Sequence, residues 1–215
     1  MKARLKDAGL AAESFDGWLL HEPFRLRTGA GRPFRVFTPF YRALRAAGEP
    51  RPPADAPDRL VAPARFPSGL APSDLDLLPL QPGWADGLAA AWTPGEAGAL
   101  ANLGRFLDDG LAFYAGRRDH PALAATSRLS PHLANGEISP HRLWHAVATA
   151  SAPLPDREKF LAELGWREFA WHLLYHQPDL AFRNHDPAFD AFPWRADAAG
   201  LRAWCRGRTG FPLVD

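Results

Sequence analysis

The sequence predicts a mainly α-helical protein, and two observations support this prediction. From residue 93 onward, apolar residues recur at helical spacing, and hydroxyl residues followed by proline mark the starts of successive helices. Residues 50–82 hold nine of the 22 prolines and show little periodicity, which is typical of an extended connector. We therefore expect three parts: a short N-terminal region at 1–49, a connector at 50–92 and a helical region at 93–215.

Composition and charge limit the classes of protein to consider. The 215 residues are 47% hydrophobic and 23% charged, which is ordinary for a globular chain long enough to form a sizeable core. The formal net charge is +1, so any contact with nucleic acid must come from a local patch. Cys205 is the single cysteine, which excludes an internal disulfide. No signal peptide or long apolar run is visible, so we expect a soluble protein of the cytoplasm that has no membrane segment.

The N-terminal region predicts one helix and one strand. Residues 1–10 read as a short helix that ends at Gly9, and residues 12–20 read as a strand with a turn at Asp16 and Gly17. One helix and one strand cannot build an α/β domain, so this region is expected to be the remnant of a larger one. The glycines at 29 and 31 lack the lysine and hydroxyl of a phosphate loop, which favours an ordinary loop.

Three helix starts are predicted in the C-terminal region. Thr93 is expected to be an N-cap, with Pro94 at the first helical position and Glu96 completing a capping box, and apolar spacing continues this helix to about Tyr114. A serine followed by proline predicts further starts at 130 and 139. A long helix is expected at 156–176, followed by a loop to residue 200 and a helical turn at 201–206.

The helix at 156–176 is apolar on nearly every side, which predicts a buried helix. It nevertheless contains Glu163 and Arg167, four residues apart on one face, with Trp166 beside them. One interpretation is an intrahelical ion pair. The other is that the carboxylate, the guanidinium and the indole line a cavity for a polar, aromatic ligand.

Histidines occur twice at the helical spacing of a metal site, as His141 with His145 and His172 with His176. Neither pair has an obvious carboxylate or cysteine to complete a metal site, so structural or surface roles are favoured. Nucleophile-elbow, zinc-protease and Walker motifs are absent from the sequence.

Residues 125–131 contain three hydroxyls and Arg128 just before a predicted helix. This pattern suits a phosphate site, because hydroxyls and helix-start N–H groups donate hydrogen bonds and arginine supplies charge. An N-cap serine beside an incidental arginine explains it equally well. Tyr114, Arg117, Arg118 and Asp119 lie close enough upstream to join the same pocket. A diphosphate at 126–130 and an aromatic ring system near 160–167 would together describe a flavin dinucleotide.

These segments resemble the DNA photolyase/cryptochrome family in their order and spacing, and within it class I cyclobutane pyrimidine dimer photolyases. The resemblance covers essentially the whole chain and includes the proline-rich connector. The motifs are Arg35-Val-Phe-Thr-Pro-Phe-Tyr41, Tyr114 with Arg118-Asp119, Thr126-Ser-Arg-Leu-Ser-Pro131, Gly136-Glu-Ile-Ser-Pro140, Glu163-Leu-Gly-Trp-Arg-Glu-Phe169 and Gly207-Arg-Thr-Gly-Phe-Pro-Leu-Val-Asp215.

The resemblance implies part of the all-helical FAD-binding domain of photolyases, preceded by a remnant of the α/β antenna domain. The implied activity is that of a carbon–carbon lyase, which repairs pyrimidine dimers in DNA under blue light by electron transfer from reduced FAD. A folate or deazaflavin antenna chromophore is expected for the family, although most of its domain is missing here. The implied FAD contacts are Tyr114, Thr126, Ser127, Arg128, Leu129, Ser130, Phe160, Glu163 and Arg167.

The resemblance also implies roles toward DNA. Glu163 would hydrogen-bond the flipped dimer and stabilise its charge after electron transfer, and glutamate here favours the cyclobutane branch over the (6-4) branch. Trp166 would stack on the dimer, and Arg118 would contact the DNA strand. Trp194, ten residues before Trp204, would form the surface end of the tryptophan relay that reduces the flavin.

A basic group follows near the C-terminus and has two interpretations. Apart from Asp197, it is unopposed by acidic residues, so it would either attract the DNA backbone or form a solvated basic face. Its members are Arg195, Arg202, Arg206 and Arg208.

Compared with the family, the chain begins after most of the antenna domain and ends before further helices of the core. We therefore expect a central fragment whose exposed apolar faces weaken FAD binding and favour aggregation. Two alternatives stay open beside a repair enzyme: a cryptochrome-like photoreceptor or interaction module, and a non-functional remnant. A monomer of the bacterial cytoplasm, associated with the nucleoid, is expected.

Overall fold

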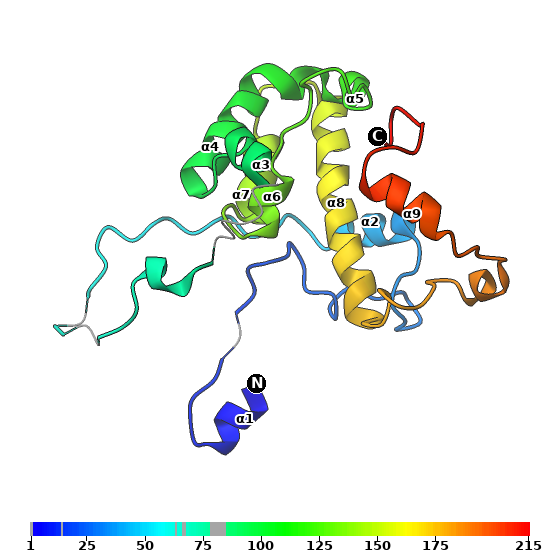
Figure 1. The fold of residues 1–215 in the computed structure, drawn as a ribbon. Coiled ribbons are helices and arrows are strands. Elements are labelled where there is room, and N and C mark those ends of the chain that lie inside the picture. Colours follow the sequence, from blue (N-terminus) through cyan, green and yellow to red (C-terminus); the bar gives the residue numbers. More distant parts are fainter. Residues whose placement is uncertain (1, 14, 63, 66–67, 78–84) are drawn as a thin grey trace. The chain divides into compact units, whose positions relative to one another are not determined.

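The computed structural model describes residues 2–13, 15–62, 64–65, 68–77 and 85–215 (Figure 1). These residues are helical or irregular, and none of them belongs to a β-strand. They fall into two compact units, Met1–His176 and Gln177–Asp215. The predicted mainly α fold is therefore confirmed for the part of the chain that the structure describes.

The first unit is built around α8 (Leu154–His176), the long helix predicted at 156–176. It contacts α2 (Phe37–Ala46), α5 (Tyr114–Arg117) and α7 (Pro140–Ala148), as Figure 1 allows the reader to follow. The core forms where the apolar faces of these helices meet. Its fully buried side chains include Phe40, Leu44, Phe106, Leu111, Leu129, Leu143, Trp144 and Val147.

Helix α8 is not buried on every side, and this part of the prediction is wrong. Phe160, Leu161, Leu164 and Phe169 are buried, whereas Trp166 is 48% exposed as a residue. Trp171, Leu174 and Tyr175 are also exposed. The helix therefore presents one apolar face to the core and leaves large aromatic side chains on another.

The predicted helix at 93–114 forms, but it begins differently. Helix α4 (Glu96–Arg105) follows Gly95, whose φ of 92° suits glycine, and no side chain caps it. The expected Thr93 cap and capping box are therefore wrong. The chain continues through a π-helical turn, η3 (Phe106–Gly110), and a 3-10 turn, η4 (Leu111–Phe113), into α5.

The other two helix starts differ from each other. Ser139 caps α7 as predicted, because its Oγ accepts the backbone N–H of Arg142 at 3.1 Å. Helix α6 (Ser130–Ala134) instead begins at Ser130 itself, after Leu129, and has no side-chain cap. The expected capping role of Ser130 is therefore wrong.

Several short elements lie outside this core. In the first unit they are α1 (Lys2–Asp7), η1 (Pro72–Leu75) and α3 (Asp86–Ala91), and part of the predicted connector lies outside the described residues. The second unit contains η5 (Pro187–Ala191) and α9 (Ala198–Cys205), which begins earlier than the helical turn predicted at 201–206. Among the helices that the structure describes, none has both the length and the apolar character needed to cross a membrane.

The strand predicted at 12–20 is wrong for all of its described residues, which are irregular. Side chains of α7 and α8, rather than a neighbouring strand, bind the backbone at the end of this segment and at His21 just after it. Glu168 accepts the N–H groups of Leu20 at 2.8 Å and His21 at 3.4 Å. Arg167 donates to the carbonyl of Trp18 at 3.0 Å. Buried backbone groups need hydrogen-bond partners, and here side chains supply the partners that a neighbouring strand would supply in a sheet.

Candidate functional site

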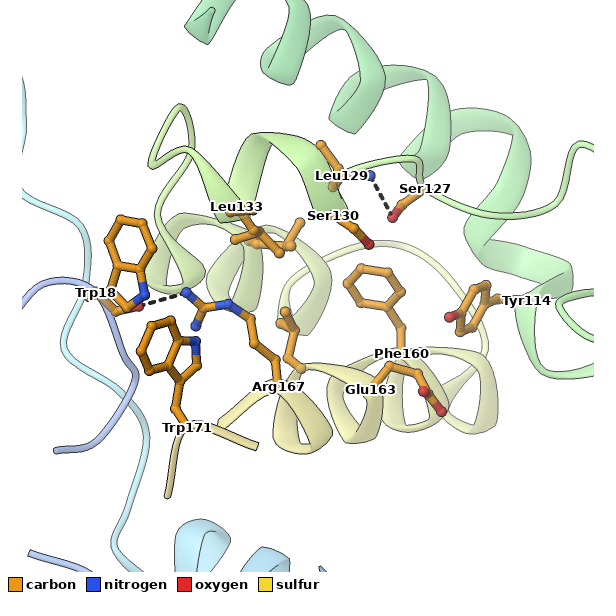
Figure 2. A pocket seen from close by; sticks show the side chains of 13 residues that line it. Trp18, Tyr114, Ser127, Leu129, Ser130, Leu133, Phe160, Glu163, Arg167 and Trp171 are labelled. Atoms are coloured by element: carbon orange, nitrogen blue, oxygen red, sulfur yellow. Dashed lines mark hydrogen bonds between the residues drawn. The ribbon is translucent and has the colours of Figure 1, made fainter. Parts of the chain in front are cut away.

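A cavity of about 390 Å³ lies beside α8 in the first unit (Figure 2). Its volume falls within the roughly 300–1,000 Å³ typical of small-molecule sites. Figure 2 shows Tyr114, Phe160 and Glu163 toward one end and Trp18, Arg167 and Trp171 toward the other. The lining residues are Trp18, Tyr114, Ser127, Leu129, Ser130, Leu133, Ala134, Leu143, Phe160, Glu163, Leu164, Arg167 and Trp171.

The hydroxyl-rich turn before α6 forms one wall of this cavity. Ser127, Leu129 and Ser130 line it, and the Ser127 Oγ accepts the N–H of Leu129 at 3.4 Å. Thr126 is exposed and is not among the lining residues. The turn therefore presents two of its three hydroxyls to the cavity.

Arg128 points elsewhere. Its backbone has a φ of 56°, in the left-handed region, and its guanidinium donates to the carbonyl of Ala91 at 3.0 Å. The same group lies 4.3 Å from the ring centroid of Trp92. The guanidinium expected to supply charge at this turn is thus engaged with the end of α3.

The aromatic end of the cavity is tightly packed. The ring centroid of Phe160 lies 5.3 Å from that of Tyr114, in an edge-to-face arrangement, and 4.8 Å from that of Phe106. Burial raises the pKa of the Tyr114 hydroxyl above its usual range. These contacts fix two rings and one hydroxyl in the wall.

Glu163 is held at the rim by cations, but Arg167 is not one of them. The carboxylate of Glu163 forms an ion pair with Arg118 of the segment after α5, and Nζ of Lys159 lies 3.4 Å from the same carboxylate. Arg118 also contacts Asp119 at 3.1 Å. The intrahelical pair between Glu163 and Arg167 is therefore wrong, because Glu163 pairs with Arg118 and Arg167 pairs with Glu168.

Arg167 pairs instead with the next residue on its own helix. Its guanidinium lies 2.8 Å from the Glu168 carboxylate, which is 3% exposed as a residue. Burial raises the pKa of Glu168 to about 7 and lowers that of Arg167. Because Arg167 also binds the Trp18 carbonyl, one side chain joins the cavity wall to the N-terminal segment.

Trp166 does not line this cavity. Its indole lies parallel to the ring of Phe37, with centroids 3.6 Å apart and an interplanar angle of 7°. The structure thus brings the serine hydroxyls, Glu163 and Arg167 around one cavity. Trp166, which lies between Glu163 and Arg167 in sequence, points to a different face of α8.

Trp194 belongs to the second unit. Its Nε1 donates to the carbonyl of Phe189 at 2.9 Å, and its ring lies 4.7 Å from that of Phe192. The indole is 66% exposed. The four arginines of the basic group are also exposed there, and Asp197 caps α9 through the N–H groups of Ala199 and Gly200.

The paired histidines bind backbone groups. Nε2 of His172 accepts the N–H of Phe34 at 3.0 Å, and Nε2 of His176 lies 3.3 Å from the Pro23 carbonyl. His141 contacts the carbonyls of Leu19 and Arg51, and His145 contacts that of Pro50. Within the residues that the structure describes, no group of three side chains is suited to hold a metal ion.

Two tryptophans of the cavity were not predicted. Trp171 lies one helical turn after Arg167, so the spacing of Phe160, Glu163 and Arg167 along one face would have indicated it. Trp18 contacts Trp171 edge to face at 6.1 Å, across more than 150 positions of sequence. A contact over that separation leaves no local signal.

Comparisons with known proteins point in one direction. Residues 1–58 match the family model described as DNA photolyase, and residues 160–215 match the one described as the FAD binding domain of DNA photolyase. Deoxyribodipyrimidine photo-lyase of Agrobacterium fabrum is 50% identical over 100% of this chain and 45% of its own length. Its counterpart in Thermus thermophilus is 41% identical over 92% of this chain and 43% of its own length.

Two further relatives extend this picture. Cryptochrome-1 of Arabidopsis thaliana is 30% identical over 96% of this chain and 32% of its own length. The crystal structure of a bacterial class III photolyase from Agrobacterium tumefaciens superimposes with a TM-score of 0.92 at 49% identity, and the match covers 99% of this chain and 45% of that one. The chain thus spans less than half the length of these relatives.

Proposed function

The chain belongs to the DNA photolyase/cryptochrome family, and from this membership we propose that it forms part of a flavoprotein that repairs cyclobutane pyrimidine dimers in DNA under blue light. Such a protein is a deoxyribodipyrimidine photo-lyase, a carbon–carbon lyase. The solved relative is described as class III, whereas the sequence motifs resembled class I. The proposal therefore extends to cyclobutane photolyases in general.

The cavity beside α8 is the observation that supports this function best. The hydroxyls of Ser127 and Ser130, the guanidinium of Arg167 and the rings of Tyr114 and Phe160 converge on it. Hydroxyl and guanidinium groups suit phosphate oxygens, and aromatic rings suit a flat ring system. This donor set fits a flavin dinucleotide.

We assign these residues to FAD, together with Leu129 and Glu163, which also line the cavity. Thr126 and Arg128 are assigned on family resemblance, and Arg128 through its backbone, since its side chain binds Ala91. When bound, reduced FAD supplies the electron that blue light transfers to the dimer. The chain's own residues bind the cofactor, exclude water from it and shape the surface that meets DNA.

The remaining residues act toward the lesion. A dimer reaches a buried flavin only when it is turned out of the duplex, and a damaged site unstacks at lower cost. Glu163 hydrogen-bonds the flipped dimer and stabilises its charge after electron transfer, while Trp166 stacks on it. Arg118, which already holds the Glu163 carboxylate, contacts the DNA strand. Trp194 forms the surface end of an electron relay, and its 66% exposure suits that position.

The same proposal includes the organisation of the chain. Residues 1–49 derive from the antenna domain, 50–92 form the connector and 93–215 form the first part of the helical domain. The family matches at 1–58 and 160–215 support the assignment of the first and the last of these parts. The antenna chromophore is a folate or a deazaflavin. The protein acts as a monomer on DNA in the bacterial cytoplasm, near the nucleoid.

Reconstitution with FAD tests the proposal. The purified chain is expected to retain protein-bound flavin absorption and to prefer an oligonucleotide with a thymine dimer over the undamaged one. Glu163→Ala should lower dimer binding and repair steeply and flavin retention less. Glu158→Ala, which removes another acid of α8 that pairs with Arg45, is the matched control. A chain that retains neither flavin nor dimer DNA would contradict the function.

A cryptochrome-like photoreceptor is the second candidate, because Cryptochrome-1 of Arabidopsis matches 96% of the chain. Such a protein binds flavin and repairs nothing. The same measurements separate the two functions: flavin retention with no preference for dimer DNA, and no effect of Glu163→Ala on DNA binding, would favour the photoreceptor.

A further inference from the structure

The feature that leads beyond the cavity is a stack of three aromatic rings between α2 and α8. The indole of Trp166 lies parallel to Phe37 at 3.6 Å and 7°. Phe37 in turn lies parallel to Tyr41, one helical turn later, at 5.4 Å and 16°. We call Trp166, Phe37 and Tyr41 the aromatic stack. Two of its rings come from α2, which precedes the connector in sequence.

Two neighbours on α8 hold the aromatic stack in place. The buried ring of Phe169 packs edge to face on two rings. Its centroid lies 5.9 Å from that of Phe37, with an interplanar angle of 66°, and 6.0 Å from that of Trp166, with an angle of 71°. Gly165 gives room for Tyr41, since a Cβ at this position would lie 2.5 Å from its Cδ2 atom. The stack therefore rests directly on the helix backbone.

Trp166 is 48% exposed as a residue, although its indole is packed on Phe37. Because Phe37 covers one face of the ring at van der Waals separation, the exposed surface of Trp166 lies on the other face, the ring edge and the rest of the residue. A flat aromatic ring that is held by a neighbouring ring and is partly exposed offers a surface on which another flat ring stacks.

We propose that Phe37, supported by Tyr41, is a positioning residue that fixes the plane of Trp166 for stacking on a pyrimidine turned out of DNA. The proposal rests on the proposed function, in which Trp166 meets the dimer. It adds that helix α2, which precedes the connector, sets the orientation of the indole on which the dimer stacks. An indole already held in one orientation loses less side-chain freedom when the base arrives, and this preorganisation strengthens binding.

The expected effect follows from the size of one ring contact. Aromatic pairs contribute about 0.5–1.5 kcal/mol beyond area burial, which corresponds to about two- to twelvefold in affinity. Phe37→Leu keeps an apolar side chain but removes the parallel ring, so dimer affinity should fall by a factor in this range. Phe37→Tyr restores the ring and should restore the affinity.

A double-mutant cycle tests the proposal in the full chain reconstituted with FAD. The measurement is the Kd for a single-stranded oligonucleotide with one thymine dimer, for the wild type, Phe37→Leu, Trp166→Leu and the double variant. If Phe37 acts through Trp166, Phe37→Leu raises the Kd in the wild-type background but changes the Kd little in the Trp166→Leu background. Phe24→Leu removes another exposed ring paired with α8, at Tyr175, and should leave the Kd unchanged.

A second measurement reports the ring itself. In protein labelled with 5-fluorotryptophan, the fluorine resonance assigned to Trp166 should move and broaden in Phe37→Leu and return in Phe37→Tyr. An unchanged resonance, or equal losses of affinity from Phe37→Leu with and without Trp166, would overturn the positioning role while leaving the proposed function intact. A wild type with no preference for dimer DNA would overturn the proposed function, and this inference with it.

Discussion

The carboxylate of Glu168 accepts the backbone N–H of Leu20 at 2.8 Å, although the two residues are 148 positions apart. It also accepts the N–H of His21 and pairs with Arg167. One buried acid of α8 thus satisfies the backbone of a segment that has no strand partner. This contact joins the N-terminal region to the helix that forms the cavity.

Replacing this acid should be costly. Glu168→Ala leaves the buried N–H of Leu20 without a partner and Arg167 without its carboxylate, so we expect a loss of about 3 kcal/mol in the free energy of unfolding. Urea denaturation at pH 7 measures it. Glu158→Ala breaks a more exposed pair with Arg45 and should cost about 1 kcal/mol or less. Equal losses in both variants would contradict the role given to Glu168.

Glu168 also predicts a dependence of stability on pH. Burial raises its pKa from the usual 4.5 to about 7, so between these values the folded state holds a proton that the unfolded state has released. Its contribution to stability is complete below pH 4.5 and is lost as the pH rises through 7, by about 3 kcal/mol. Denaturation of the wild type and Glu168→Gln from pH 4.5 to 8 measures this loss as the difference between them. A difference that does not vary with pH would contradict the prediction.

His172, one helical turn later, should act in the opposite direction. Burial lowers the pKa of His172 from 6.5 to about 4, since the residue is only 1% exposed, and the neighbouring His176 acts in the same direction. Its contribution is complete above pH 6.5 and is lost as the pH falls toward 4, by about 3 kcal/mol. His172→Gln keeps an acceptor without a titrating ring, so the wild type should lose stability relative to this variant on acidification.

These two residues offset each other over an overlapping range of pH. The wild type alone is therefore expected to show a shallow dependence between pH 4.5 and 6.5, and the two single variants should reveal slopes of opposite sign. A steep slope in the wild type that neither substitution alters would place the titrating group elsewhere.

Local signals predicted much of this architecture. The serine–proline start at 139 and the long helix predicted at 156–176 depend on neighbouring residues, and the structure has both, the latter as Leu154–His176. The hydroxyl turn and the acidic and basic residues of α8 were predicted to share a cavity, and Ser127, Glu163 and Arg167 line one. Spacing within a helix placed Glu163 and Arg167 on one face, whereas the convergence of the hydroxyl turn on the same cavity was expected from the order of the family's motifs.

Contacts over long sequence separations were not predictable. Residues 12–20 were predicted to be a strand, but the backbone at the end of this segment binds Arg167 and Glu168, which no local pattern reveals. Glu163 was placed with Arg167 by helical spacing, yet it pairs with Arg118 because the segment after α5 docks against α8. The histidine pairs resembled half of a metal site because the backbone groups that they bind lie far away in sequence.

The hydroxyl of Ser130 is predicted to contribute to flavin binding. It lines the cavity and does not cap α6, so Ser130→Ala removes a donor from the site rather than from the helix. One neutral hydrogen bond is worth about 1 kcal/mol, and the Kd for FAD should therefore rise about fivefold. Titration by flavin fluorescence measures it. Thr149→Ala, whose hydroxyl binds the carbonyl of His145, is the control and should leave the Kd unchanged.

Gly165 and Tyr41 form a pair whose substitutions should compensate. Alanine is favoured over glycine inside a helix by about 1 kcal/mol, but at 165 its Cβ would meet the Tyr41 ring at 2.5 Å. Overpacking of this kind costs about 1–3 kcal/mol, so Gly165→Ala should lower the free energy of unfolding by about 1 kcal/mol. Gly104→Ala in α4 meets no atom within 4 Å and should raise it by a similar amount.

The effect of Gly165→Ala should depend on whether the Tyr41 ring is present. With Tyr41→Ala in the background the clash is gone, so the same Gly165→Ala substitution should become stabilising by about 1 kcal/mol, the value of helix propensity alone. Urea denaturation of the two single variants and the double variant measures the change of sign. If Gly165→Ala had the same effect in both backgrounds, Tyr41 would not be resting on the backbone of α8, and the aromatic stack would lose its support.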